Sequence, residues 1–161
     1  MKCAPANPCA AMEPLRCGVK GVYVAVGPLG ASPAVVLSHG EDTCLPIYIG
    51  LWEAISIHNA LKAEVSPRPL THDLFVEFLN KLNVALQSLL IDALEDGIYY
   101  GRLVFVQDNR EISLDCRPSD GIAICVRCQA PILVDPQVMA DSGLPSAELP
   151  PLQDLDAYLS G

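Results

Sequence analysis

Short apolar runs separated by turn-forming residues fill the first third of the chain. Residues 19–26, 34–38 and 45–49 are rich in β-branched and aromatic side chains, which favours strands. Glycine, proline and acidic residues interrupt these runs, as expected for turns. Apolar residues then recur on one side of a predicted helix over residues 51–61. This part of the sequence therefore predicts three strands followed by a helix.

The clearest helical pattern begins after Pro67 and Pro69, which end the preceding helix because proline lacks a backbone donor and restricts the residue before it. Thr71 is a suitable N-cap for the new helix. Apolar residues then recur at the spacing of one helix face, at Leu74, Phe75, Phe78, Leu79 and Leu82. The sequence thus predicts a second helix directly behind the first.

The second half of the chain again alternates apolar runs with turns. Residues 84–94 end near Asp96-Gly97, a strong hairpin signal, and residues 98–106 return as a strand. The segments predicted next are a strand at 111–116, a helix capped by Ser119 that runs to about residue 128, a short extended piece at 131–134 and a short helix at 136–142.

The two halves match when the first is shifted by 67 positions. Leu45, Ile47, Ile49, Glu53, Ala54, Ile55 and Ile57 then fall on Ile112, Leu114, Cys116, Asp120, Gly121, Ile122 and Ile124. Chance apolar matches are common, but the shared order of three strands and a helix favours an internal duplication. The predicted fold is α+β, a duplicated β-β-β-α(α) repeat forming a curved, mostly antiparallel six-stranded sheet or partial barrel with packed helices.

The length and composition indicate one domain. The chain has 161 residues, of which 51% are hydrophobic and 18% charged, a globular balance. We expect a mobile leader over 1–16, one domain over 17–144 with repeat halves at about 19–82 and 84–142, and a loosely held acidic, proline-rich tail over 145–161. No apolar run reaches the length of a membrane span and the start lacks a secretory signal, so we expect no membrane contact and a cytoplasmic location.

The net charge and the cysteine positions disfavour some kinds of binding site. The formal net charge is −9 and only ten residues are Lys or Arg, which disfavours tight, metal-free binding to a nucleic-acid backbone. The seven cysteines are odd in number and irregularly spaced, which disfavours a disulfide framework. Cys125 and Cys128 form a lone C-x-x-C without a second ligand pair, so we expect core cysteines and no zinc.

Two short segments, 68–73 and 115–120, concentrate the polar chemistry. Each places Arg-Pro before a Ser or Thr and a carboxylate in the first helical turn. The helix dipole favours an acidic residue there, so two well-formed helix starts explain the pattern without any function. Alternatively, the segments form a site, because carboxylates can hold Mg²⁺ or Mn²⁺, arginine suits phosphate, and histidine moves protons near neutral pH. The groups concerned are Arg68, His72, Asp73, Asp115, Arg117 and Asp120.

The same residues carry a resemblance to a known family. The motifs are Leu45-Pro46-Ile47-Tyr48-Ile49-Gly50 with Glu53-Ala54 behind it, Arg68-Pro69-Leu70-Thr71-His72-Asp73-Leu74, Asp96-Gly97 before Tyr99, and Arg117-Pro118-Ser119-Asp120-Gly121-Ile122-Ala123. In this order they resemble the motifs of the bifunctional nuclease family, over about residues 19–144. Gly121 departs from the family pattern, in which alanine is expected.

The resemblance implies a domain linked to cleavage of RNA and DNA in some plant members. It also implies a site with His72, Asp73, Arg117 and Asp120 as catalytic residues. Arg68, Arg117 and Ser119 would bind substrate, Asp73, Asp115 and Asp120 would hold Mg²⁺ or Mn²⁺, and Glu53 is a weaker addition. A divalent cation between carboxylates and phosphate would reconcile the acidic chain with nucleic acid.

Two functions of different classes remain open. One is a weak metal-dependent nuclease, a phosphodiesterase acting on RNA or DNA. The other is a non-catalytic domain that binds a small anion or assembles with a protein partner, using an arginine beside a helix terminus. We also expect the protein to form a homodimer, with an apolar sheet edge or helix face as the contact surface.

Overall fold

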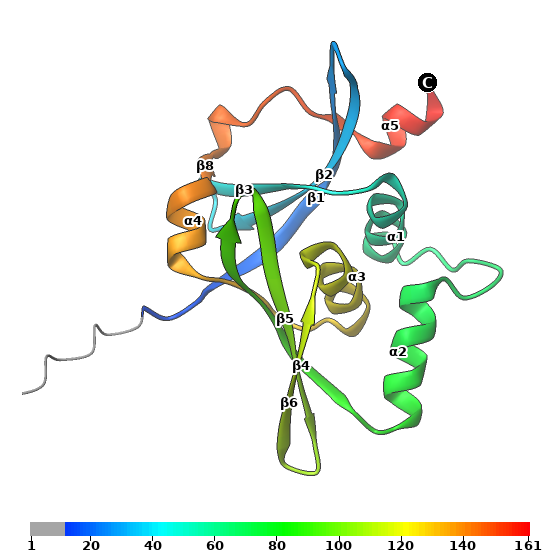
Figure 1. The fold of residues 1–161 in the computed structure, drawn as a ribbon. Coiled ribbons are helices and arrows are strands. Elements are labelled where there is room, and N and C mark those ends of the chain that lie inside the picture. The colour runs from blue at the N-terminus through cyan, green and yellow to red at the C-terminus, as the bar shows by residue number, and fades with distance from the viewer. Residues whose placement is uncertain (1–11) are drawn as a thin grey trace, which may run out of the picture.

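The computed structural model describes residues 12–161 and shows an α+β fold (Figure 1). Within this range there are nine strands, five α-helices and one 3-10 helix. The strands are β1 Leu15–Gly27, β2 Gly30–His39, β3 Thr43–Tyr48, β4 Ala85–Glu95, β5 Ile98–Gln107, β6 Arg110–Cys116, β7 Ile132–Val134, β8 Leu144–Pro145 and β9 Gln153–Asp154. The helices are α1 Leu51–Leu61, α2 Thr71–Lys81, α3 Pro118–Cys128, α4 Pro136–Ser142, η1 Ser146–Glu148 and α5 Leu155–Ser160.

The strands form one mostly antiparallel sheet with the order β6-β5-β4-β7-β1-β2-β3-β8, and β9 pairs with β1. The single parallel contact along this path is that between β4 and β7. The pairing path does not close on itself, so the sheet is open. The expected count of six strands was wrong, because the short strands β7, β8 and β9 add to the six long ones.

The order of elements repeats along the chain. Antiparallel strands β1, β2 and β3 lead into α1, and antiparallel strands β4, β5 and β6 lead into α3. The two helices have the same length and begin at Leu51 and Pro118, which are 67 positions apart. The order agrees with the expected repeat, while duplication of one ancestral unit stays a prediction.

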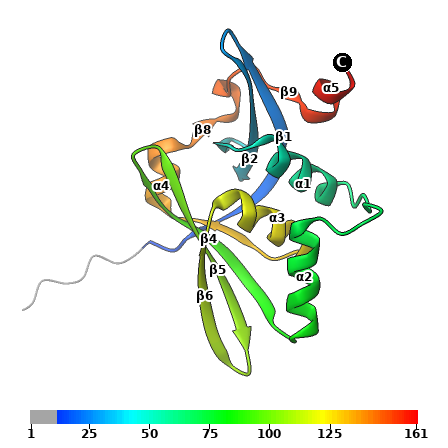
Figure 2. The same ribbon diagram turned by 45° about the vertical axis from the view of Figure 1, so that its right-hand side comes forward.

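Helices α1, α2 and α3 lie together on one side of the strands (Figure 2). Helix α3 packs closely against β4 and β5 because Gly121 has no side chain. A Cβ atom at this position would lie 2.5 Å from Cδ1 of Leu89, a fully buried residue of β4. Gly121 is therefore a packing requirement of this chain.

Replacing Gly121 by alanine is expected to destabilise the protein by about 1 kcal/mol. Alanine favours the helix by about 1 kcal/mol, but overpacking a core costs about 1–3 kcal/mol. Combining Gly121→Ala with Leu89→Val, which removes both methyl groups that would clash, should cost less than the two single changes added together. Urea unfolding of the four proteins measures this coupling, and strictly additive costs would contradict the packing argument.

Both ends of the described chain differ from expectation. Residues 1–11 of the expected leader lie outside the described residues, while Leu15 and Arg16 already belong to β1 and pair with β7. The segment 145–161 is not loosely held. Leu155 is fully buried in the core, and Nε2 of His58 on α1 lies 2.6 Å from Oδ1 of Asp156. The tail is therefore part of the folded domain.

The five cysteines of residues 12–161 are all free thiols. Burial raises the pKa of Cys17 and of Cys116 to about 11 and that of Cys125 to about 12, so these thiols stay protonated at neutral pH. Cys125 is buried, whereas Cys116 and Cys128 are partly exposed. In the same range, no helix combines the length and the apolar character that a bilayer crossing requires.

Candidate functional site

The polar chemistry gathers where α1, α2 and α3 meet. Helix α1 begins after Gly50 and α3 begins after Arg117, and these two N-cap residues occupy equivalent places in the repeated order. A Cβ atom at Gly50 would collide with the Glu53 carboxylate, so glycine lets Glu53 fold back over the start of its helix. The expected N-caps were one and two residues too late. Leu70, not Thr71, precedes α2, and Arg117, not Ser119, precedes α3.

Arg117 joins the starts of α1 and α3. Its Nε donates to Oδ2 of Asp120 at 2.7 Å and its Nη2 to Oδ1 of the same residue at 3.0 Å. Its Nη1 lies 3.1 Å from Oε1 of Glu53. The side chain is still 65% exposed, so the guanidinium keeps donors that face solvent. Arg117 is thus an anchored cation able to bind an anion.

His72, from the first turn of α2, is hydrogen bonded at both ring nitrogens. Nε2 lies 3.1 Å from Oδ1 of Asp120, and Nδ1 lies 2.8 Å from Oγ of Ser56 on α1. Because a carboxylate only accepts, Nε2 carries a hydrogen in either charge state. Nδ1 accepts from the Ser56 hydroxyl when the ring is neutral and donates to it when the ring is protonated. His72 can therefore gain or lose a proton without losing either partner.

Asp120 is ionised at neutral pH. Burial alone would raise its pKa, but the hydrogen bonds from Arg117 and His72 outweigh burial and hold the pKa below its ordinary value. The same two bonds fix the carboxylate between a guanidinium and an imidazole. Asp120 therefore serves as the orienting group of the cluster.

A second ion pair, whose arginine is more deeply buried than Arg117, lies beside the cluster. Arg127 of α3 is only 10% exposed and donates from Nε to Oδ1 of Asp73 at 2.6 Å. Its other nitrogens bond to Ser56 and to the carbonyl of Ala123. Oδ2 of Asp73 accepts from the backbone N–H of Leu70 at 2.8 Å. Burial opposes ionisation of Asp73, yet Arg127 and Leu70 together lower its pKa.

A pocket of about 400 Å³ lies over the cluster. It is lined by residues from all three contributing segments, among them Trp52, Ser56, His72, Arg117 and Asp120. Asp73 is not among the lining residues, and its two oxygens are already engaged. The structure thus gives Asp73 a place in the framework behind the pocket.

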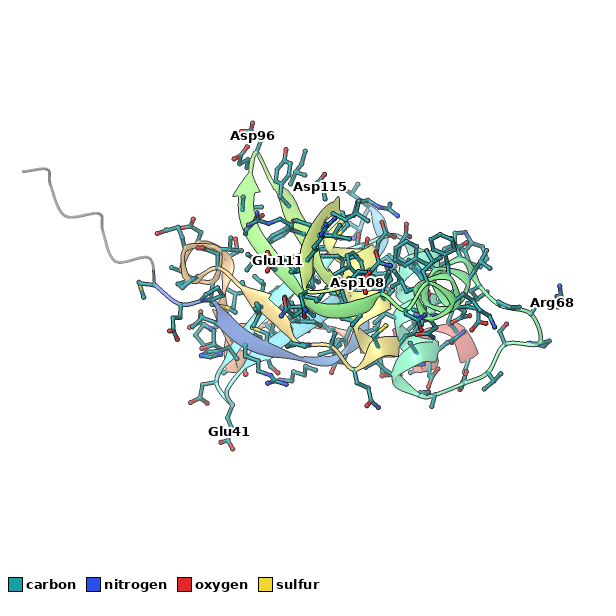
Figure 3. All side chains as sticks on the ribbon, turned by 90° about the horizontal axis from the view of Figure 1, so that it is seen from below. Glu41, Arg68, Asp96, Asp108, Glu111 and Asp115 are labelled. Carbon is teal, nitrogen blue, oxygen red and sulfur yellow. The ribbon has the colours of Figure 1, made fainter. Side chains whose placement is uncertain are left out.

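Three expected site residues lie elsewhere. Arg68 is exposed on the connection between α1 and α2 and points away from the domain (Figure 3). Asp115 is exposed on the edge strand β6, as the same view shows. Ser119 is buried in the first turn of α3 and faces a different pocket. The structure brings together His72, Arg117, Asp120 and the weaker addition Glu53.

The carboxylates do not fit a shared divalent cation as they are arranged. Across residues 12–161, no group of three or more His, Cys, Asp or Glu side chains is placed to hold a metal ion. Asp73 bonds to Arg127, Asp120 bonds to Arg117 and His72, and Asp115 lies apart on β6. Their oxygens are thus committed to different partners.

Sequence reasoning missed Ser56, Arg127 and Trp52. Ser56 lies between Ile55 and Ile57 on the apolar stretch of α1, and an isolated hydroxyl there was a usable signal. Arg127 lies between Val126 and Cys128 in a run assigned to the core, so its partners could not be inferred from the chain alone.

Fold and site together define an α+β domain whose helix starts hold an Arg–Asp–His cluster under a pocket. A profile described as the bifunctional nuclease domain matches residues 35–147. The chain belongs to the bifunctional nuclease domain family.

Individual relatives agree with this assignment. The chain is 40% identical over 113 residues to an uncharacterized protein of Mycobacterium tuberculosis, covering 70% of this chain and 67% of that protein. It is 33% identical over 116 residues to Bifunctional nuclease 1 of Oryza sativa subsp. japonica, covering 69% of this chain and 35% of the relative. For Bifunctional nuclease 1 of Arabidopsis thaliana the identity is 26% over 117 residues, covering 70% and 36%. The match spans about a third of these plant proteins.

Proposed function

We propose that this protein cleaves phosphodiester bonds of RNA and DNA, weakly, at the pocket over α1, α2 and α3. The observation that carries the proposal is His72, held between Asp120 and Ser56 beside the exposed guanidinium of Arg117. The plant relatives named bifunctional nucleases support the same class of activity.

Each group has a role that follows from its contacts. Arg117 offers its solvent-facing donors to a phosphodiester oxygen and offsets the charge that develops during cleavage. Asp120 keeps His72 in the orientation with hydrogen on Nε2. Nδ1 then takes a proton, through the Ser56 hydroxyl, from the water that attacks phosphorus, and returns it to the oxygen whose bond to phosphorus breaks. The nearby Arg127–Asp73 pair holds Ser56 in place for this transfer.

The requirement for Mg²⁺ or Mn²⁺ stays a prediction. The net charge of −9 supports it, because an acidic protein repels a polyanion unless cations intervene. The paired carboxylates oppose it, since the arginines bonded to Asp73 and Asp120 compete with a cation for the same oxygens. Activity with added Mg²⁺ or Mn²⁺ and with EDTA decides between these two views. A cytoplasmic location likewise stays a prediction.

Purified protein is expected to cut single-stranded RNA and DNA, and His72→Gln is expected to slow the cutting about a hundredfold, because it removes the proton-transfer group. Arg68→Gln is the matched control, since Arg68 lies outside the pocket, and its activity should equal that of wild type. Cleavage products are measured on labelled oligonucleotides after circular dichroism has confirmed folding. Equal activity of wild type and His72→Gln would reject the proposed site.

An assembly role is the second candidate, and one feature of α2 favours it. Leu74, Phe78 and Leu82 are exposed and spaced four residues apart, so they form an apolar row along the helix. Isolated surface hydrophobics are ordinary, but a row on one helix face is typical of a contact surface. We expect the predicted homodimer to use this row.

Phe78→Glu is expected to weaken the homodimer about tenfold or more, because it places a charge in an apolar contact. Asn80→Glu adds the same charge to another face of α2 and should leave association unchanged. Sedimentation velocity over a range of concentrations measures both. A wild-type protein that stays monomeric throughout would remove the homodimer prediction.

A further inference from the structure

Arg117 lies between two pockets. On one side is the pocket of His72 and Asp120. On the other is a pocket of about 580 Å³ between the end of β3, the start of α3 and the β4–β5 turn at Gly97. Arg117 lines both pockets, and among residues 12–161 it is the only charged residue that lines the second. A ligand that contacts this guanidinium can therefore extend in two directions.

Each pocket has an exposed aromatic side chain in its wall. Trp52, in the first turn of α1, is 79% exposed and lines the first pocket. Tyr48, the last residue of β3, is 56% exposed and lines the second. Tyr48 and Trp52 are four residues apart, so the backbone between them spans at most about 14 Å and one short strand can reach both walls. Two aromatic faces and a central cation are the elements of a stacking site for single-stranded nucleic acid.

We propose that a single nucleic-acid strand lies across Arg117, with one base stacked on Trp52, the next on Tyr48, and the phosphate between them on the guanidinium. The proposal rests on the proposed function and specifies its substrate as unpaired strand. In a duplex, pairing and stacking keep the bases from these two faces, so duplex should bind more weakly. Tyr99 and Ser119 also line the second pocket.

The charges around the strand limit its affinity. Glu53 and Asp120 both bond to Arg117, so the cation is partly neutralised before any phosphate arrives. One phosphate contact predicts a slope of about −0.7 in a plot of log affinity against log salt. Stacking, which is insensitive to salt, should therefore supply most of the binding.

The experiment uses Trp52 as a built-in probe, because it is the single tryptophan of the chain. Oligothymidylate of eight nucleotides, added in EDTA, is expected to quench the Trp52 fluorescence. An abasic strand of the same length and charge should not quench it. Tyr48→Ser, which keeps Trp52, should weaken binding of oligothymidylate about tenfold. Tyr158→Ser removes an exposed tyrosine of α5 that lies in neither pocket, and should bind like wild type.

The outcomes separate this inference from the proposed cleavage. Quenching without any cleavage would support the strand site and remove the nuclease proposal. Cleavage without quenching, with an unchanged KM in Tyr48→Ser, would keep the nuclease and overturn the strand site. Equal quenching by the abasic strand would also overturn it, because phosphate alone would then explain the signal.

Discussion

Replacing Arg127 by methionine is expected to lower the free energy of unfolding by about 3 kcal/mol. The Arg127 side chain is 10% exposed, and its guanidinium bonds to Asp73, Ser56 and the carbonyl of Ala123. Methionine keeps the apolar stem but removes all these donors, and breaking a buried ion pair by deleting one partner costs about 3–5 kcal/mol. We expect the lower end because Asp73 is partly exposed to water. Urea unfolding monitored by circular dichroism measures the change.

The matched control is Arg102→Met. Arg102 pairs with Asp92 across β5 and β4 at 2.8 Å, but its side chain is 47% exposed. Exposed pairs contribute about 1 kcal/mol or less, so this variant should unfold close to wild type. If both variants lost the same stability, burial would not be the reason for the importance of Arg127.

Asp120→Asn is expected to reduce cleavage about a thousandfold while leaving the fold intact. The new amide group would face Nε of Arg117, so that two donors oppose each other, or face Nε2 of His72 with the same result. Either orientation therefore removes an acceptor from one of the two groups, and the negative charge that bonds to both is lost. A single oriented electrostatic contact is worth about a hundredfold to a thousandfold in rate, and we expect the upper end.

Asp115→Asn removes the same charge from the exposed strand β6 and leaves the pocket untouched. It should cleave RNA and DNA at the wild-type rate. Initial rates of the three proteins are compared at equal concentrations after their unfolding curves have been recorded. An Asp120→Asn protein that is folded and fully active would show that the cluster is purely structural.

Local patterns predicted most of the elements because each depends on nearby residues. The helix that follows the two prolines and the hairpin at Asp96-Gly97 are set by backbone restrictions that act within a few positions. The short strands β7, β8 and β9 do not follow from such local patterns. Each has only two or three residues and forms because a distant strand supplies its hydrogen bonds. Strand β9, for example, pairs at Asp154 with Tyr23 of β1.

The site was predictable where its contacts are local. Arg117 and Asp120 are three residues apart across a helix start, so their ion pair follows from spacing. The outward position of Asp115 also follows from spacing, because side chains alternate along a strand and Leu114 next to it belongs to the apolar set. The partners of Arg127 could not be predicted from spacing, because Ser56 and Asp73 reach it only after three helices have packed.

The buried position of Leu155 has a consequence for synthesis of the protein. Leu155 belongs to the same core as Cys17, and Asp156 bonds to His58 on the helix that carries Glu53 and Ser56. The core is therefore complete only after residue 155 has left the ribosome, although the β1–β2 hairpin can pair much earlier. Contacts between segments so far apart also predict slow folding. The emerging chain thus exposes apolar strands until this segment has been made, a period in which chaperones can bind them.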